Sequence, residues 1–179
     1  MKKIFLVLLA IATLNQLLAA QGERVANRVF YTELGGPGVI MSANFDTRFD
    51  SNERLGFGYR LGAGFGYKEE YGRYNNQWGY YDYVTRTYFS IPAGVNYVFG
   101  KPDSNKTFEV GAGLTFLTRK AALYYYNEGK TGYMIGHFTF MYRVMPVDGG
   151  FSFRVGLTPM IGTSGNLMPS GAIGFGYVF

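Results

Sequence analysis

The most regular feature of this sequence is an alternation of apolar residues with small or polar ones, which starts near residue 39 and recurs to the end of the chain. Between 55 and 67, odd positions hold Leu, Phe, Tyr or Ala and even positions hold Gly or Arg. Successive side chains of a β-strand point to opposite faces, so a period of two indicates strands with one apolar face. Seven segments are predicted as strands: 39–49, 55–67, 88–99, 108–117, 133–144, 151–161 and 173–179.

The segments between these strands alternate in length. The short ones are rich in Asp, Asn, Gly, Pro and Ser and comprise 50–54, 100–106 and 146–150. The mostly longer ones are 68–87, 119–131 and 162–169. Short turns at one end, long loops at the other and strands of about ten residues are typical of transmembrane β-barrels. Such a barrel needs an even strand number, so 27–34 is predicted as a further strand, joined to the next through Gly35-Gly36-Pro37-Gly38.

Two architectures would use these faces differently. In a soluble sandwich or lipocalin-like barrel, the apolar face points inward and the water-exposed face is rich in Lys, Glu, Thr and Gln. Here the opposite face is mostly glycine with a few arginines, which suits a narrow interior better. The sequence therefore favours an all-β fold, an eight-stranded antiparallel up-and-down transmembrane β-barrel. Its aromatic face would meet lipid and its small and polar face would fill the lumen.

Composition narrows the class of protein further. The 179 residues include 26 glycines, 18% aromatic and only 16% charged residues, and no cysteine. The lack of cysteine excludes a disulfide scaffold, a thiolate metal site and a cysteine nucleophile. The formal charge is +5, but no basic run is longer than Arg119-Lys120, so we expect no nucleic-acid partner. One histidine without a carboxylate cluster cannot complete a metal shell, so neither a metal nor another cofactor is expected.

The first twenty residues have the order of a secretory signal peptide. Lys2 and Lys3 precede an apolar stretch over 4–12, and the segment closes on Ala19-Ala20. The apolar stretch is too short for a spanning helix, which needs about 20 residues. A buried N-terminal helix is the alternative interpretation. We expect a signal peptide over 1–20 and an outer-membrane β-barrel domain over 21–179.

Charged residues within the predicted strands all fall on the lumen face. They are Asp46, Arg48, Arg60, Glu109, Arg143 and Arg154. With both termini and the short turns in the periplasm, all of them come in the periplasmic half of the lumen. Arginine suits such a place because its planar fork of donors binds carboxylates in fixed geometry. We expect a hydrogen-bonded ion-pair cluster that plugs the lumen. An anion-attracting constriction in a narrow pore is the alternative.

The segment 68–87 is unusually rich in aromatic and amide residues and is a candidate extracellular binding loop. Its candidate binding residues are Tyr71, Tyr74, Trp78, Tyr80, Tyr81 and Tyr83. Tyr and Asn combine large contact area with adaptable hydrogen bonding, as in adhesive loops. The alternative is that these rings anchor the barrel at the outer lipid interface, where aromatic girdles occur.

The end of the chain carries the most specific motif. Phe175, Tyr177 and Phe179 alternate with smaller residues and end on an aromatic carboxyl terminus. This motif resembles the C-terminal strand signal of Gram-negative outer-membrane barrels, and residues 27–179 resemble the OmpA-, OmpX- and OmpW-like eight-stranded barrels in architecture. The resemblance implies that the barrel-assembly machinery reads these three residues. It also implies outer-membrane lipid as the surrounding partner and the cell outer membrane as the location.

The function that we expect is a structural or surface-interaction role through the extracellular loops, for a monomeric barrel with an unidentified extracellular ligand. A narrow channel for small or apolar solutes is one alternative. Another is a lipid-modifying enzyme, since some small outer-membrane barrels are lipid A acyltransferases or deacylases. Such an enzyme would use His137 as a base beside a serine and an acid. A lone lumen histidine is more often a packed hydrogen-bonding residue, and we therefore expect no enzyme activity.

Overall fold

A computed structural model describes residues 25–75, 79–121, 132–163, 165 and 167–179. The strands are β1 (Arg28–Gly35), β2 (Met41–Arg48), β3 (Gly56–Asn75), β4 (Tyr80–Gly100), β5 (Lys106–Ala121), β6 (Gly132–Val144), β7 (Gly150–Leu157), β8 (Met160–Gly162), β9 (Leu167–Met168) and β10 (Gly171–Val178). A 3-10 turn, η1 (Gly36–Gly38), joins β1 to β2. Within these ranges no helix is long and apolar enough to cross a membrane.

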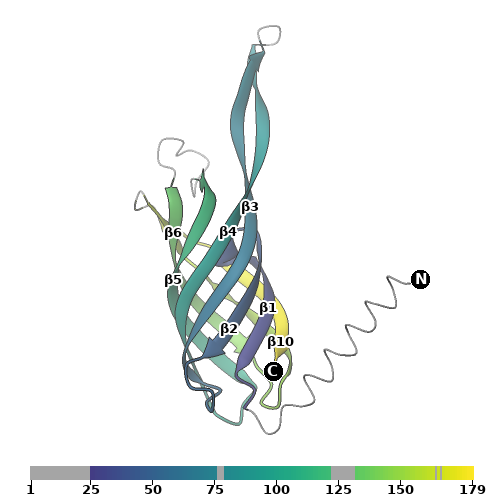
Figure 1. The fold of residues 1–179 in the computed structure, drawn as a ribbon, viewed down its shortest axis with the longest axis vertical. Helices are drawn as coiled ribbons and strands as arrows, with labels where there is room; N and C mark the ends of the chain where they lie inside the picture. Colours follow the sequence, from purple (N-terminus) through teal and green to yellow (C-terminus); the bar gives the residue numbers. More distant parts are fainter. Residues whose placement is uncertain (1–24, 76–78, 122–131, 164, 166) are drawn as a thin grey trace, which may run out of the picture.

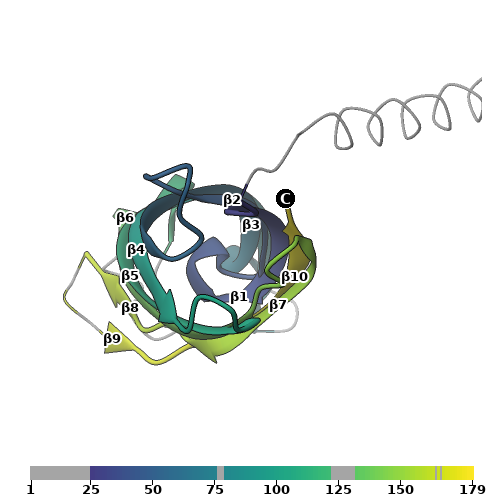
Figure 2. The same cartoon turned by 90° about the horizontal axis from the view of Figure 1, so that it is seen from below.

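Strands β1 to β7 and β10 form a closed antiparallel barrel, as predicted (Figures 1 and 2). Each pairs with its neighbours along the barrel, and the β1–β10 and β5–β6 pairs complete the ring. The expected first strand is confirmed as β1. Its alternation is weak in sequence because the side chains that point inward include Val29 and Tyr31, which are as apolar as those pointing outward.

The apolar face of the barrel points outward. Phe57, Phe89 and Leu157 are each 66% exposed, whereas polar residues of the opposite face, such as Asn44 and Thr107, are buried. Aromatic rings also contact one another around the outside, with Phe57–Tyr97 centroids 4.7 Å apart. A domain dissolved in water shows the opposite arrangement, with apolar side chains inside. The exterior is therefore built for contact with lipid.

The two ends of the barrel differ. The short turns over 49–55, 101–105 and 145–149 lie together with Val25 and the C-terminal Phe179 at one end, which we call the turn end (Figure 1). The opposite end, where β3 meets β4 and β5 meets β6, is called the loop end. The three predicted turns are confirmed at the turn end.

At the loop end, the prediction of a loop over 68–87 is wrong for most of its length. β3 continues to Asn75 and β4 begins at Tyr80, so the two strands rise together above the barrel (Figure 1). Residues 66–75 and 80–88 form this projection, which we call the ribbon. Tyr, Thr and Val favour strands, and directly opposed residues stabilise a strand pair. The tyrosines that suggested a loop therefore lie in strands: Tyr71 and Tyr74 in β3, and Tyr80, Tyr81 and Tyr83 in β4.

The predicted strand over 151–161 is divided into two. β7 ends at Leu157, opposite Phe140 of β6, and β8 pairs further along β6, with Met160 opposite His137. Pro159 lies between them and has no N–H to donate to the ladder. Its carbonyl still accepts a hydrogen bond from the Phe138 N–H at 3.0 Å. The predicted loop over 162–169 is shortened in turn, because β9 folds back onto β8.

Candidate functional site

A connected network of buried charged side chains fills the middle of the lumen. Arg143 Nη1 lies 2.7 Å from Glu109 Oε2 and 3.3 Å from Asp46 Oδ2. Arg154 Nη2 lies 3.0 Å from Glu109 Oε1, and Arg48 pairs with Asp46. These side chains have at most 2% of their surface exposed. The structure thus brings together residues from β2, β5, β6 and β7 that are far apart in sequence.

Arg60, the remaining predicted member, joins the network through a residue that sequence reasoning missed. Glu33 of β1 has Oε1 3.8 Å from Arg60 Nη2 and Oε2 3.3 Å from Arg154 Nε. The Tyr31 ring lies 4.4 Å from the Arg154 guanidinium, a cation–π distance. Four arginines therefore face three carboxylates, not the two expected. Reading 27–34 with Tyr31 on the inner face would have placed Glu33 there as well.

Glycines on neighbouring strands make room for these long side chains. A Cβ at Gly174 would lie 2.8 Å from Arg154 Cγ, and one at Gly58 would lie 2.5 Å from Arg48 Cζ. Carbon atoms do not approach so closely without displacing one another. The glycine-rich face that the sequence assigned to the lumen is therefore the surface on which the buried guanidinium groups lie, which explains a residue type that is otherwise unfavourable in strands.

Towards the loop end, the connection between β1 and β2 folds into the barrel. All three residues of η1 are buried. The Thr115 hydroxyl donates a hydrogen bond to Pro37 O, and the Ser90 hydroxyl donates one to Gly38 O, each at 2.8 Å. A cluster of buried apolar side chains continues from η1 towards the loop end: Tyr88, Leu117, Ile135 and Met160. The connection thus acts as a plug held by hydrogen bonds from the neighbouring strands β4 and β5.

His137 belongs to this plug. Its Nδ1 lies 3.2 Å from the Thr115 hydroxyl oxygen. Because that hydroxyl donates its proton to Pro37 O, the ring nitrogen is the donor in the pair. The partner that the structure gives His137 is thus a threonine bound to the backbone, whereas a hydrolytic base needs a serine and an acid. The described part of the chain also contains no group of three or more His, Asp or Glu side chains placed to hold a metal ion.

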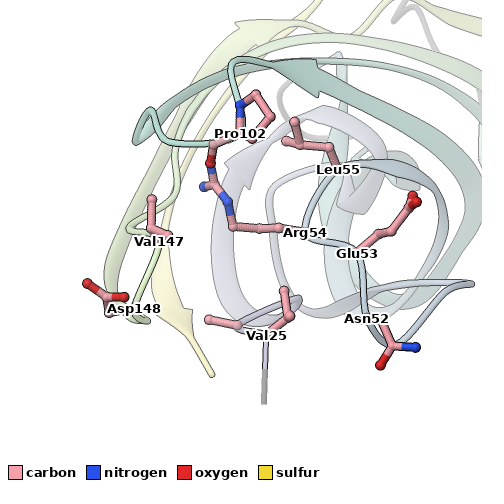
Figure 3. Close-up of a pocket in the computed structure, with 9 residues that line it drawn as sticks. Val25, Asn52, Glu53, Arg54, Leu55, Pro102, Val147 and Asp148 are labelled. Atoms are coloured by element: carbon pink, nitrogen blue, oxygen red, sulfur yellow. The ribbon is translucent and has the colours of Figure 1, made fainter. Parts of the chain in front are cut away.

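The turn end is spanned by one arginine. Arg54, in the turn between β2 and β3, reaches across the mouth towards Pro102 in another turn (Figure 3). Its Nη1 donates to Met145 O at 2.7 Å, and its Nη2 donates to Pro102 O at 2.9 Å and Ser104 O at 2.6 Å. Burial lowers the pKa of Arg54, and the Asp103 carboxylate opposes that shift. One side chain therefore ties three chain segments together.

The same arginine borders a cavity of about 710 Å³ at this mouth. Leu55 and Val147 give it apolar walls, and the Glu53 and Asp148 carboxylates lie at its margin (Figure 3). Below it a buried apolar cluster separates the cavity from the charged network: Ala26, Val29, Tyr31, Val98, Met145 and Val178. The lumen is thus layered, with apolar side chains at both ends and ions in the middle.

We expect Arg54→Ala to lower the free energy of unfolding by about 2–3 kcal/mol. A hydrogen bond from a charged donor contributes about 1.5–3 kcal/mol, and the three carbonyls that lose Arg54 lie at the mouth of the barrel, where water can replace part of what they lose. Urea titration of the barrel refolded in detergent micelles measures this change. Lys101→Ala, at an exposed position of a neighbouring turn, is the control and should change stability by less than about 0.5 kcal/mol. Equal effects of the two variants would contradict the bridging role of Arg54.

The aromatic residues of the predicted binding loop lie in the ribbon. Tyr71 and Tyr74 belong to β3, and Tyr80, Tyr81 and Tyr83 to β4. The register places Tyr71 opposite Tyr83 and Tyr74 opposite Tyr81, with one irregularity between the two pairs. The side chains of Tyr81 and Tyr83 are 51% and 58% exposed. Trp78 lies outside the described residues, as does the expected signal peptide over 1–20.

The C-terminal strand closes the barrel. Phe175 and Tyr177 point outward, and the backbone of Phe179 exchanges hydrogen bonds of 2.9 and 3.1 Å with Arg28. The Phe179 ring lies 6.4 Å from that of Phe45, on the far side of β1. The three residues of the predicted assembly signal thus stand on the outer surface of the seam between the first and last strands.

A closed eight-stranded antiparallel barrel with an apolar exterior and a polar, ion-paired interior is the architecture of outer-membrane β-barrels. No protein-family model and no curated protein matches the chain. Several solved structures are similar to it in fold, and two of them are compared with it below. The N-terminal β-barrel domain of Pseudomonas aeruginosa OprF shares 16% identity over 89% of this chain and 100% of that one, with a TM-score of 0.47.

The second similar structure is that of Ail, the attachment invasion locus protein of Yersinia pestis, in complex with the heparin analogue sucrose octasulfate. It shares 11% identity over 87% of this chain and 98% of that one, with a TM-score of 0.40.

Proposed function

We propose that this protein is a non-conducting structural barrel of the outer membrane that carries a rigid contact surface, the ribbon, outside the cell. The observation that carries the proposal is that β3 and β4 stay paired beyond the wall of the barrel as far as Asn75 and Tyr80, with one register shift between Tyr71 and Tyr74. A flexible loop loses conformational entropy when a partner orders it, and a preformed strand pair loses much less. A projection built as an extension of the wall is therefore suited to binding.

The location rests on the expected signal peptide and on the apolar exterior. Aromatic side chains such as Phe57 and Phe151 cover the outside of the barrel, and the charged side chains of its middle lie inside. With the short turns in the periplasm, the ribbon points away from the cell. We further propose that the barrel acts as a monomer and that Phe175, Tyr177 and Phe179 are the residues that the barrel-assembly machinery reads.

Removing the ribbon tests the surface role. Residues 68–86 are replaced by Asn-Gly, the preferred two-residue hairpin turn, which keeps Tyr67 opposite Thr87. Because the barrel wall is untouched, its unfolding midpoint in urea should be unchanged. Binding to at least one probe on a glycan array or a peptide array should fall at least tenfold. A full-length chain that binds none of these probes, or a shortened chain that binds as well, would overturn the role.

A point variant tests whether binding depends on the tyrosine side chains or only on the presence of the ribbon. Tyr81→Ala together with Tyr83→Ala removes two exposed rings from β4 and leaves the backbone register in place. The matched control is Thr85→Ala, an exposed position of the same strand. We expect the double variant to lose most of the binding and the control to keep it, measured on the same surfaces.

Because the lumen is filled with side chains, we expect the protein not to conduct ions. Apolar clusters at both ends and the ion-pair network between them leave charged solutes without a hydrated path. Planar bilayers containing the protein should show no single-channel steps above the bare membrane, with a general porin as positive control. Stable steps would favour the alternative function of a narrow channel, in which the excess of arginine over carboxylate would select anions.

A further inference from the structure

The outer wall of the barrel carries a hollow on its apolar face. It lies between β5, β6 and β8, has a volume of about 340 Å³ and is bordered by Leu114, Met134, Gly136, Phe138 and Ile161. Leu114, Met134 and Phe138 are each at least 40% exposed on the apolar exterior. The hollow therefore opens on the apolar exterior, while Gly113 and the buried His137 also line it.

Gly136 keeps this hollow open, and crowding does not explain why it is a glycine. A Cβ at Gly136 would come no closer than 3.7 Å to Ile161 O and 4.0 Å to Ile161 Cβ. The lumen glycines differ, since a Cβ at Gly156 or Gly113 would lie within 2.2 Å of a carbonyl oxygen. Glycine in a strand is less stable than alanine by about 0.5–1 kcal/mol. Neither crowding nor a left-handed backbone conformation requires glycine at position 136. The remaining reason for it is that another molecule occupies the space that a side chain would fill.

A cationic side chain lies further along these strands, towards the loop end. Lys120 of β5 has its Nζ 5.6 Å from the ring centre of Tyr133 on β6, and Arg119 precedes it. Six residues separate Leu114 from Lys120, about 20 Å along a strand. At a tilt of about 40° this is roughly 15 Å along the membrane normal, half the hydrocarbon thickness of a bilayer. A lipid whose phosphate lies at Lys120 would thus reach the hollow with its acyl chain.

We propose that the hollow at Gly136 binds an acyl chain of lipid A in the outer leaflet, with Lys120 at its phosphate. The inference rests on the proposed outer-membrane location, because the loop end faces the outer leaflet there. Lipid A fits both observations: it is anionic at the level of Lys120 and carries acyl chains at the level of the hollow. Lipids without net negative charge would gain less from this cation.

The experiment uses the full barrel in vesicles of phosphatidylcholine with lipid A that bears a photoreactive diazirine on an acyl chain. Peptide mapping after illumination should show labelling concentrated on 112–114 and 134–138. Gly136→Leu, which fills the hollow, should reduce that labelling at least fivefold. Ala63→Leu places the same leucine side chain elsewhere on the lipid face and should leave the labelling unchanged. Lys120→Ala should reduce labelling by lipid A, but not by a diazirine phosphatidylcholine.

Three outcomes would overturn the inference. Labelling spread evenly around the barrel would mean that no site exists, and equal labelling by phosphatidylcholine would mean that lipid A is not preferred. Labelling unaffected by Gly136→Leu would place the chain elsewhere. Gel mobility of unheated samples reports insertion separately, so a protein that fails to insert contradicts the proposed function and not the lipid site.

Discussion

Glu109→Gln is expected to lower the free energy of unfolding of the barrel by about 3–5 kcal/mol, the largest effect of any charge-removing substitution in the lumen. The carboxylate of Glu109 binds both Arg143 and Arg154 at 2.7 and 3.0 Å. Arg143 keeps Asp46 and Arg154 keeps Glu33, but four arginines would then face two carboxylates away from water, and removing one partner of a buried ion pair costs about this much. Urea titration in lipid vesicles, followed by heat-dependent gel mobility, measures the loss.

The control for this prediction is Glu53→Gln, an exposed carboxylate at the mouth of the barrel. It should change the unfolding free energy by less than about 0.5 kcal/mol. Glu109→Leu combined with Arg154→Met removes a pair of opposite charges and should recover part of the loss, since apolar replacement of a whole ion pair is often close to neutral. A Glu109→Gln barrel within 1 kcal/mol of the parent would show that the network is not tightly coupled.

Gly176→Ala is expected to impair barrel closure, with a cost of about 3 kcal/mol, the upper end of the usual range for overpacking. Gly176 pairs directly with Tyr31 across the seam between β10 and β1. A Cβ there would lie 2.3 Å from Phe30 O and 2.8 Å from Tyr31 Cα. These are backbone atoms, so relief requires the two strands to move apart. Folding yield into vesicles and the urea midpoint should both fall.

Gly136→Ala provides the matched control, because it makes the same change where the nearest atom would be 3.7 Å away. Alanine restricts the unfolded chain more than glycine does, so this variant should be unchanged or more stable by a few tenths of a kcal/mol. If both substitutions destabilise the barrel equally, steric crowding at the seam is not the reason that Gly176 is glycine.

The barrel could be predicted from the sequence because the strands of a membrane barrel alternate between lipid-facing apolar residues and lumen-facing small or polar residues. From 39 to 49 the apolar side chains fall on one face and the polar ones on the other, and the structure keeps that division in β2. The same rule predicted burial of Asp46, Arg48, Arg60, Glu109, Arg143 and Arg154 in the lumen.

Alternation did not predict the structure in two places: where the side chains inside the barrel are apolar, and where β3 and β4 extend beyond the barrel. Val29 and Tyr31 face inward, so β1 showed little alternation and Glu33 went unnoticed as a lumen residue. In the ribbon, residues 81–87 are all exposed, so no burial enforces alternation there, and the segment resembled a loop. The inward fold of η1 depends on hydrogen bonds from Thr115 and Ser90, which are remote in sequence and leave no local signal.

The charged network has a consequence for the order of folding events. Its side chains come from β1, β2, β3, β5, β6 and β7, while Asn96 of β4 donates to Asp46 at 2.6 Å and Gly174 of β10 makes room for Arg154. An incomplete sheet would leave at least one guanidinium or carboxylate facing hydrocarbon without its partner. Partly closed intermediates are therefore penalised, and the barrel is expected to form and unfold as a single cooperative unit.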